Sequence, residues 1–246
     1  MSSLVWISGA TQGIGEALAE TVPFESARVV NLSRRQHPHL ETVVFDLAEP
    51  STWDRVVDHM ASELRSSRYQ RVIFIHSACL IEDHAFIGQA DPAGYRRAVQ
   101  ANMAAPLVLG EAFIRNCPAD VDAGLVFLTS GVAQNVAEGM AGYSAAKAAI
   151  EQWVRVAHRE RATRGTGPWV AAVRPGLVDT PRTRHEARSD PRDLPNVMAY
   201  RAAFEGGEAS EPLTVAREIW ASLPPRGDDP ILRVGRVPGG FATTAR

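Results

Sequence analysis

A tyrosine and a lysine stand four residues apart in the segment Tyr143-Ser144-Ala145-Ala146-Lys147. Side chains at i and i+4 share one face of a helix, so these two are predicted to lie side by side. An ammonium close to a phenol favours the phenolate, which is expected to move the pKa of Tyr143 from about 10 toward the working range. The pair therefore predicts a general acid or base, and the alternative is an ordinary contact on a helix surface.

Lys147 is the only lysine in the chain, because the other 25 of the 26 basic residues are arginines. Arginine keeps its charge and presents a planar fork, whereas lysine is a compact ammonium whose pKa shifts readily. A lysine retained in such a chain indicates a task that a guanidinium cannot perform, unless the composition only reflects codon usage.

A glycine-rich segment, Gly9-Ala10-Thr11-Gln12-Gly13-Ile14-Gly15, follows the apolar run Leu4–Ser8 and precedes the Ala-rich stretch Glu16–Glu20. Glycines at a strand-to-helix turn let the backbone approach a pyrophosphate, whose charge meets the free N–H groups of the helix N-terminus. The context favours a dinucleotide site over a plain turn. The candidate cofactor contacts here are Gly9, Thr11, Gln12, Gly13, Ile14 and Gly15.

The second expected strand ends in Ser33-Arg34-Arg35. Sites selective for NAD usually place an acidic residue here to bind the ribose diol, whereas a small residue followed by guanidinium groups suits a 2′-phosphate. We therefore expect NADP(H) to be preferred over NAD(H), unless the two arginines are simply solvated. Asp46 and Leu47 follow the third strand, and Asp46 is either a contact to the adenine edge or a cap before the next helix.

Ser130 follows an apolar strand whose carboxyl end is expected at the ligand edge of a doubly wound sheet, where its hydroxyl would bond a substrate oxygen. Asn102 opens an apolar helical stretch, and its type and place are typical of an N-cap.

The elements that must position these residues alternate between short apolar runs and longer helical patterns. Strands are expected at Leu4–Ser8, Arg28–Leu32, Val43–Phe45, Arg71–Ile75, Gly124–Thr129, Trp169–Val173 and Ile231–Val234. Helices are expected at Ser51–Arg65 with Ser51 as N-cap, at Ala101–Asn116 and at Tyr143–Arg161. This alternation predicts an α/β fold: a single-domain, doubly wound, Rossmann-type parallel sheet of about seven strands with helices on both faces.

Composition excludes several classes of protein. The chain has 246 residues with 45% hydrophobic and 22% charged content and a net charge of −2, which fits one globular domain over residues 1–246. No charge excess indicates nucleic acid or an anionic membrane, and Cys79 and Cys117 alone make neither a disulfide framework nor a metal site. Without a signal-like start or an apolar run of about 18–20 residues, a cytoplasmic protein that does not bind membranes is expected.

Residues 181–210 are rich in Arg, Asp, Pro and Gly, with a helical patch around Val197–Phe204. The segment is long for a connection, so a lid over a substrate site is expected rather than a solvated excursion.

Together these residues resemble the short-chain dehydrogenase/reductase superfamily over nearly the whole chain, and within it the sepiapterin reductase and benzil reductase branch. The resemblance matches the glycine segment, Ser130, the Tyr143–Lys147 pair, Asn102 and the stretch Pro175-Gly176-Leu177-Val178-Asp179-Thr180. It implies cofactor contacts from Ser77, Ala78, Pro175, Gly176, Val178 and Thr180, and from Tyr143 and Lys147. It also implies that Tyr143 transfers the proton, Ser130 positions the carbonyl, Lys147 holds the nicotinamide ribose and Asn102 orders a water.

Two places depart from the family pattern. His76-Ser77-Ala78-Cys79 stands where Asn-Asn-Ala-Gly is usual, and Gln12 stands where NADP-selective members often have a basic residue. His76 is expected to be a structural histidine that replaces the hydrogen bonds of the usual asparagine. Because Cys79 stands where the family has a glycine, the sequence does not predict the path of the backbone at this position.

The leading interpretation is an NADPH-dependent reductase of a small ketone or diketone, with Tyr143 as general acid. One alternative is a 3-oxoacyl thioester reductase of fatty-acid type, which would need a basic docking surface such as Arg96-Arg97 or Arg155 and Arg159. Another is an NADP(H)-binding redox sensor without turnover. A homodimer or homotetramer is implied by the resemblance only.

Overall fold

The computed structural model of the chain describes residues 2–66, 68–81 and 83–241. Its strands form one parallel seven-stranded sheet in the order β3-β2-β1-β4-β5-β6-β7. The strands are β1 (Ser3–Ser8), β2 (Arg28–Ser33), β3 (Glu41–Val44), β4 (Arg71–His76), β5 (Asp122–Leu128), β6 (Trp169–Arg174) and β7 (Ile231–Arg233). The order reverses direction at β1, between β2 and β4, which is the doubly wound arrangement expected from the sequence.

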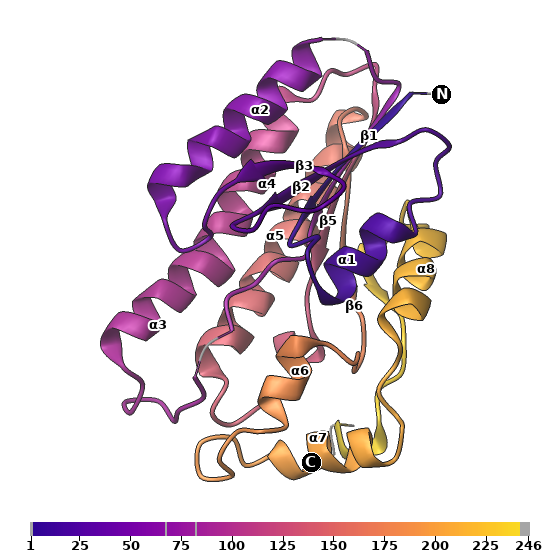
Figure 1. Cartoon of the computed structure of the whole chain (residues 1–246). Coiled ribbons are helices and arrows are strands. Elements are labelled where there is room, and N and C mark those ends of the chain that lie inside the picture. The colour runs from indigo at the N-terminus through magenta and orange to yellow at the C-terminus, as the bar shows by residue number, and fades with distance from the viewer. Residues whose placement is uncertain (1, 67, 82, 242–246) are drawn as a thin grey trace.

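Helices cover both faces of this sheet, as Figure 1 shows. Helices α2 (Trp53–Arg65), α4 (Ala105–Asn116) and α5 (Ala141–Arg164) pack on one face, and α1 (Gly13–Glu20) and α8 (Pro212–Ser222) pack on the other. Since side chains alternate along a strand, Leu4 and Trp6 of β1 lie in the first core, and Val5 and Ile7 lie in the second. Both faces of the central strands are buried, so these strands are largely apolar, and the Rossmann-type fold is confirmed.

One expected helix begins differently. The sequence predicted a helix over Ala101–Asn116, but helix α3 (Pro92–Val99) runs into a π-helical turn, Gln100–Ala104, that leads into α4. Asn102 is therefore not an N-cap, because it lies inside a continuous helical stretch. The cap role predicted for Ser51 is also wrong, since Thr52 stands at the N-cap of α2 and the Ser51 hydroxyl bonds Glu49.

The segment 181–210 contains helices α6 (Pro181–Glu186) and α7 (Val197–Glu205), the latter over the predicted helical patch. Both lie beyond the carboxyl ends of the strands, at the bottom of Figure 1. The segment closes a third apolar cluster in which Leu194, Val197 and Tyr200 pack with Met140 and Tyr143. In the part of the chain that the structure describes, no helix has both the length and the apolar character needed to span a membrane.

Candidate active site

A cavity of about 870 Å³ opens at the carboxyl ends of the strands and is lined in part by residues of α6 and α7. Its volume lies in the range of small-molecule sites, and its position at the reversal of the strand order is where doubly wound sheets bind ligands. Nearly all residues predicted to bind cofactor or substrate line it. Gly15 and Asn102 do not belong to this lining.

The glycine segment forms the floor of one end of the cavity. Gly9 has a φ of +75°, and a Cβ at this position would stand 3.1 Å from the Cα of Ala78 on the neighbouring strand end. Gly15 lies in the first turn of α1, where a Cβ would stand 2.2 Å from the carbonyl oxygen of Gly9. Larger residues at either place would force the backbone apart, so the glycines allow the helix N-terminus to come close to the cavity.

Two arginines line the cavity beside this segment. The Nη2 atom of Arg35 donates to Oε1 of Gln12 at 2.7 Å and to the hydroxyl of Thr11 at 3.2 Å. Arg34 lies 3.7 Å from the carboxylate of Asp46, across the same end of the cavity. The guanidinium of Arg35 thus places positive charge beside Gln12, the position where the sequence lacked a basic residue.

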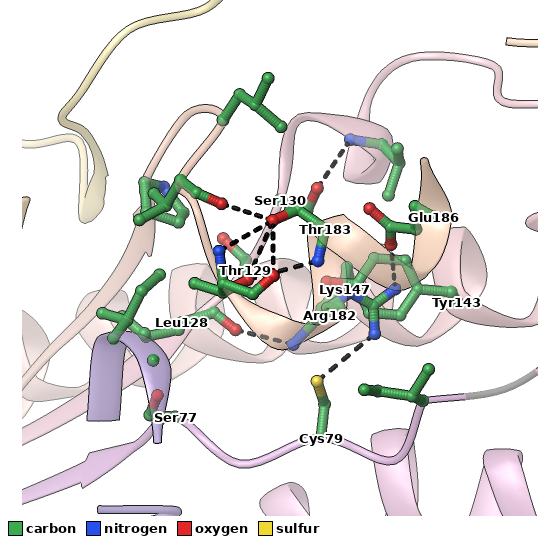
Figure 2. Close-up of a pocket in the computed structure, with 18 of the residues that line it drawn as sticks. Ser77, Cys79, Leu128, Thr129, Ser130, Tyr143, Lys147, Arg182, Thr183 and Glu186 are labelled. Carbon is green, nitrogen blue, oxygen red and sulfur yellow. Dashed lines mark hydrogen bonds and ion pairs between the residues drawn. The ribbon is translucent and has the colours of Figure 1, made fainter. Parts of the chain in front are cut away.

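Tyr143 and Lys147 lie side by side on α5 and are both buried, with 6% and 4% of their surface exposed. The Nζ of Lys147 lies 5.3 Å from the centroid of the Tyr143 ring and donates to the carbonyl oxygen of Leu128 at 2.7 Å (Figure 2). This burial excludes the helix-surface contact that the sequence left as an alternative.

The sequence predicted that the pKa of Tyr143 is lowered, and for the protein alone this prediction is wrong. Burial raises the pKa of Tyr143, because desolvation penalises the phenolate, and the cation that lowers this pKa is Arg182. Burial also lowers the pKa of Lys147 to about 8. The sequence correctly predicted that the ammonium lies beside the phenol. It could not predict how strongly burial changes the pKa of each group.

Ser130 stands just beyond β5 and lines the cavity with Tyr143. A hydrogen bond between Ser130 and the phenol also favours the phenolate of Tyr143. The loop after Ser130 is anchored from below, since Nη1 of Arg174 donates to Oε1 of Gln134 at 2.7 Å. Arg174 is in turn held by a buried two-pronged ion pair with Glu151, which lies one turn after Lys147 on α5.

His76 is a buried structural histidine. It lies next to Ser8 in the register of β1 and β4, with its Nδ1 3.2 Å from the Ser8 hydroxyl oxygen. That oxygen accepts hydrogen bonds from the N–H groups of Ser77 and Ala78, so its own hydrogen is available to the imidazole. Burial, assisted by the charge of Lys147, lowers the pKa of His76 to about 3 and keeps the ring neutral. Ser8 and His76 together hold the strand end that approaches Gly9.

Asn102 holds the next part of the same segment. Its Oδ1 accepts from the backbone N–H of Leu80 at 2.7 Å, and its Nδ2 donates to the Leu80 carbonyl oxygen at 3.1 Å. Leu80 lines the cavity, so Asn102 shapes the wall from behind.

Arg182 and Glu186 are residues of the site that sequence reasoning missed. Arg182 comes from α6, lies against the Tyr143 ring and forms an i,i+4 ion pair of 2.9 Å with the nearly buried Glu186 (Figure 2). The spacing of the pair and the start of its helix at Thr180-Pro181 are visible in the sequence, since Thr180 caps α6 together with Thr183. Nothing local to that segment indicates that it folds back onto α5.

Comparison with known proteins agrees with this geometry. The family model of short chain dehydrogenases matches residues 3–191. The chain belongs to the short-chain dehydrogenase/reductase family. It is thus an oxidoreductase of a family that binds a nicotinamide cofactor.

Curated relatives of this family member are distant in sequence. It is 24% identical to a benzil reductase ((S)-benzoin forming) of Bacillus cereus over 227 residues, which cover 87% of this chain and 91% of the relative. It is 26% identical to a 3-oxoacyl-[acyl-carrier-protein] reductase of Salmonella typhimurium over 220 residues, covering 83% and 84% of the two chains.

Solved structures share its fold. A short chain dehydrogenase/reductase from Saccharomyces cerevisiae superposes with a TM-score of 0.80 at 16% identity, covering 98% of this chain and all of the other. An aldohexose dehydrogenase from Thermoplasma acidophilum gives a TM-score of 0.75 at 22% identity and covers 95% and 92%.

Proposed function

We propose that the protein reduces a small ketone or diketone to the alcohol with NADPH, and that Tyr143 is the general acid. One observation carries the proposal: Ser130, Tyr143 and Lys147 line one cavity together with the glycine segment and the two arginines. The proposed proton donor, carbonyl-binding hydroxyl and dinucleotide cradle thus share one cavity.

The residues that fit a dinucleotide are those of the cradle. The close approach of Gly9 to Ala78 and of Gly15 to Gly9 brings the start of α1 against the cavity, where a pyrophosphate is proposed to bind, and Arg34 and Arg35 are proposed to hold a 2′-phosphate. Lys147, Pro175, Gly176, Val178 and Thr180 also line the cavity and are proposed to hold the nicotinamide end. When bound, the cofactor supplies the hydride.

The side chains of the protein supply the proton. The Ser130 hydroxyl binds the carbonyl oxygen of the substrate, and Tyr143 gives its phenolic proton to the same oxygen as the alcohol forms. Oxygen thus receives the proton and carbon the hydride. Lys147 is proposed to bind the nicotinamide ribose and to keep the phenol in place, and Asn102 to order a water that returns the proton.

An apolar wall favours a small, largely apolar substrate. Beyond Tyr143 the cavity is lined by Ile81, Val132, Met140, Leu177 and Tyr200. The segment 181–210 supplies part of this wall, and we propose that it acts as the lid that excludes water from the reaction.

A homodimer or homotetramer is proposed with α4 and α5 in the subunit interface. Val108 on α4 and Val156 on α5 are large apolar side chains with 46% and 48% of their surface exposed. Light scattering of the purified protein tests the oligomeric state directly.

A substrate panel with both cofactors tests the function. Oxidation of NADPH and of NADH is followed with aliphatic and aromatic ketones, vicinal diketones and 3-oxoacyl thioesters. We expect turnover of ketones or diketones with NADPH, and its loss in Tyr143→Phe but not in the control Tyr95→Phe, whose side chain is exposed on α3. Activity confined to thioesters, faster turnover with NADH, or bound NADPH without any turnover would each contradict the proposal.

A further inference from the structure

Arg182 holds a permanent positive charge against the face of Tyr143. Its guanidinium carbon lies 3.7 Å from the ring centroid, and only 17% of its side chain is exposed. One nitrogen donates to the Sγ of Cys79 at 3.4 Å, and another lies 2.9 Å from the carboxylate of Glu186 (Figure 2). One partner from the same helix and one from a distant part of the chain thus fix the guanidinium on the phenol.

Lys147 lies farther from the Tyr143 ring than Arg182 does, and its ammonium has another partner. Its Nζ lies farther from the ring centroid, at 5.3 Å, and is engaged with the carbonyl oxygen of Leu128. Burial lowers the pKa of Lys147 to about 8, so above that pH the ammonium is lost, whereas a guanidinium remains charged. The cation that persists beside the phenol at all working pH values is Arg182.

We propose that Arg182 is a positioning residue whose guanidinium, stacked on Tyr143 and held by Cys79 and Glu186, sets the acidity of the catalytic phenol. This proposal rests on the proposed function, because it acts through the proton that Tyr143 exchanges with substrate. Glu186 has the opposite effect: it holds the guanidinium in place and its own negative charge disfavours the phenolate.

The groups that face Tyr143 come from five parts of the fold. They are Lys147 on α5, Ser130 after β5, Cys79 after β4, Arg182 and Glu186 on α6, and Tyr200 on α7. Burial raises the pKa of Tyr143, Arg182 and the Ser130 hydrogen bond lower it, and Cys79 and Glu186 raise it. Arg182 and Glu186, the two partners of the ion pair, therefore shift the pKa of Tyr143 in opposite directions. Two single variants can test this difference.

The acidity of the phenol is measured without any substrate. Fluorinated tyrosine, which ionises at lower pH than tyrosine, is incorporated throughout the full chain, and phenolate absorbance is followed against pH. The step that disappears in Tyr143→Phe belongs to position 143. Arg182→Met is expected to move this step up by about one pH unit or more, and Glu186→Gln to move it down. Arg182→Lys, which keeps the charge, is expected to restore part of the shift.

The control is Arg192→Met, which removes the same charge from the same segment at a side chain that is 88% exposed. It should leave the step in place. Structural damage would move the pH of this absorbance step in the same direction in Arg182→Met and in Glu186→Gln. Shifts of the same sign in both variants therefore overturn the proposal. An unchanged step in Arg182→Met overturns it as well. Circular dichroism selects the pH range in which each variant stays folded.

Kinetics with an accepted carbonyl substrate separate this role from substrate binding. Arg182→Met is expected to lower kcat with KM changed less than about twofold, because the guanidinium acts on proton transfer. A raised KM with unchanged kcat would make Arg182 a substrate contact and overturn the proposal. If no carbonyl is turned over at all, the proposed function fails, while the titration still decides the effect of Arg182 on the phenol.

Discussion

The ammonium of Lys147 donates a hydrogen bond to the backbone carbonyl oxygen of Leu128 across 2.7 Å, in the interior of the protein. The contact ties helix α5 to the carboxyl end of β5, two residues before Ser130. A lysine four residues after Tyr143 therefore connects the element that carries the phenol to the strand end that carries the serine. A compact head group fits this enclosed place.

Replacing Lys147 by arginine is predicted to preserve the fold and to abolish most turnover. The guanidinium is wider than the ammonium and cannot occupy the same enclosed position without moving Tyr143 or the strand end. We expect kcat to fall by about 100-fold or more, the scale of a misplaced acid–base group. Steady-state kinetics and thermal unfolding of the two proteins measure this. Near-normal turnover would mean that the single lysine reflects codon usage only.

Removing both arginines beside the glycine segment is predicted to weaken NADPH binding selectively. Each charge-assisted hydrogen bond to a phosphate contributes roughly 1.5–3 kcal/mol, so the loss of one such bond from each arginine in Arg34→Ala/Arg35→Ala should raise the Kd for NADPH about 100-fold or more. The Kd for NADH should stay within about threefold, because it has no 2′-phosphate to lose. Fluorescence titration of both cofactors provides the measurement. The exposed pair Arg217→Ala/Arg226→Ala is the control, and equal losses for both cofactors would contradict the assignment.

His76 is predicted to make the protein sensitive to acid. Burial lowers its folded-state pKa to about 3, below the 6.5 expected when unfolded, so between these values the unfolded chain binds the extra proton. Stability from the neutral ring is present above the unfolded value and is lost as the pH falls toward the folded one. From about pH 7 to 4.5 this is on the order of 2–3 kcal/mol in the free energy of unfolding.

Urea unfolding at both pH values tests the role of His76. His76→Asn, which does not titrate and still accepts a hydrogen bond from Ser8, should lose less stability in acid than the parent protein. His39→Asn, at an exposed position, is the control. An identical loss in the parent and in His76→Asn would show that another group is responsible.

The buried pair of Glu151 and Arg174 is predicted to stabilise the region beneath Ser130. Glu151→Gln would leave the guanidinium of Arg174, of which 9% is exposed, without its carboxylate, and should reduce the free energy of unfolding by about 3–5 kcal/mol. Glu111→Gln breaks an exposed i,i+4 pair with Arg115 and should change it by less than about 1 kcal/mol. Denaturant melts compare the two, and equal effects would refute the structural role of the buried pair.

Sequence alone determined those parts of the protein that depend on local spacing. Alternating apolar runs and amphipathic stretches predicted the doubly wound sheet, and an i,i+4 separation on a helix necessarily places Tyr143 beside Lys147. Glycines between a strand and a helix predicted the cradle at Gly9–Gly15, where the structure has a close approach of backbones.

Tertiary structure decided what depends on contacts between distant segments and on the loss of water. The return of α6 onto α5 places Arg182 on Tyr143, and the register of β1 with β4 places Ser8 beside His76. Neither contact has a local signal, because each joins residues far apart in the chain. Desolvation reversed the expected direction of the Tyr143 pKa, since the free energy of a buried charge depends on everything packed around it.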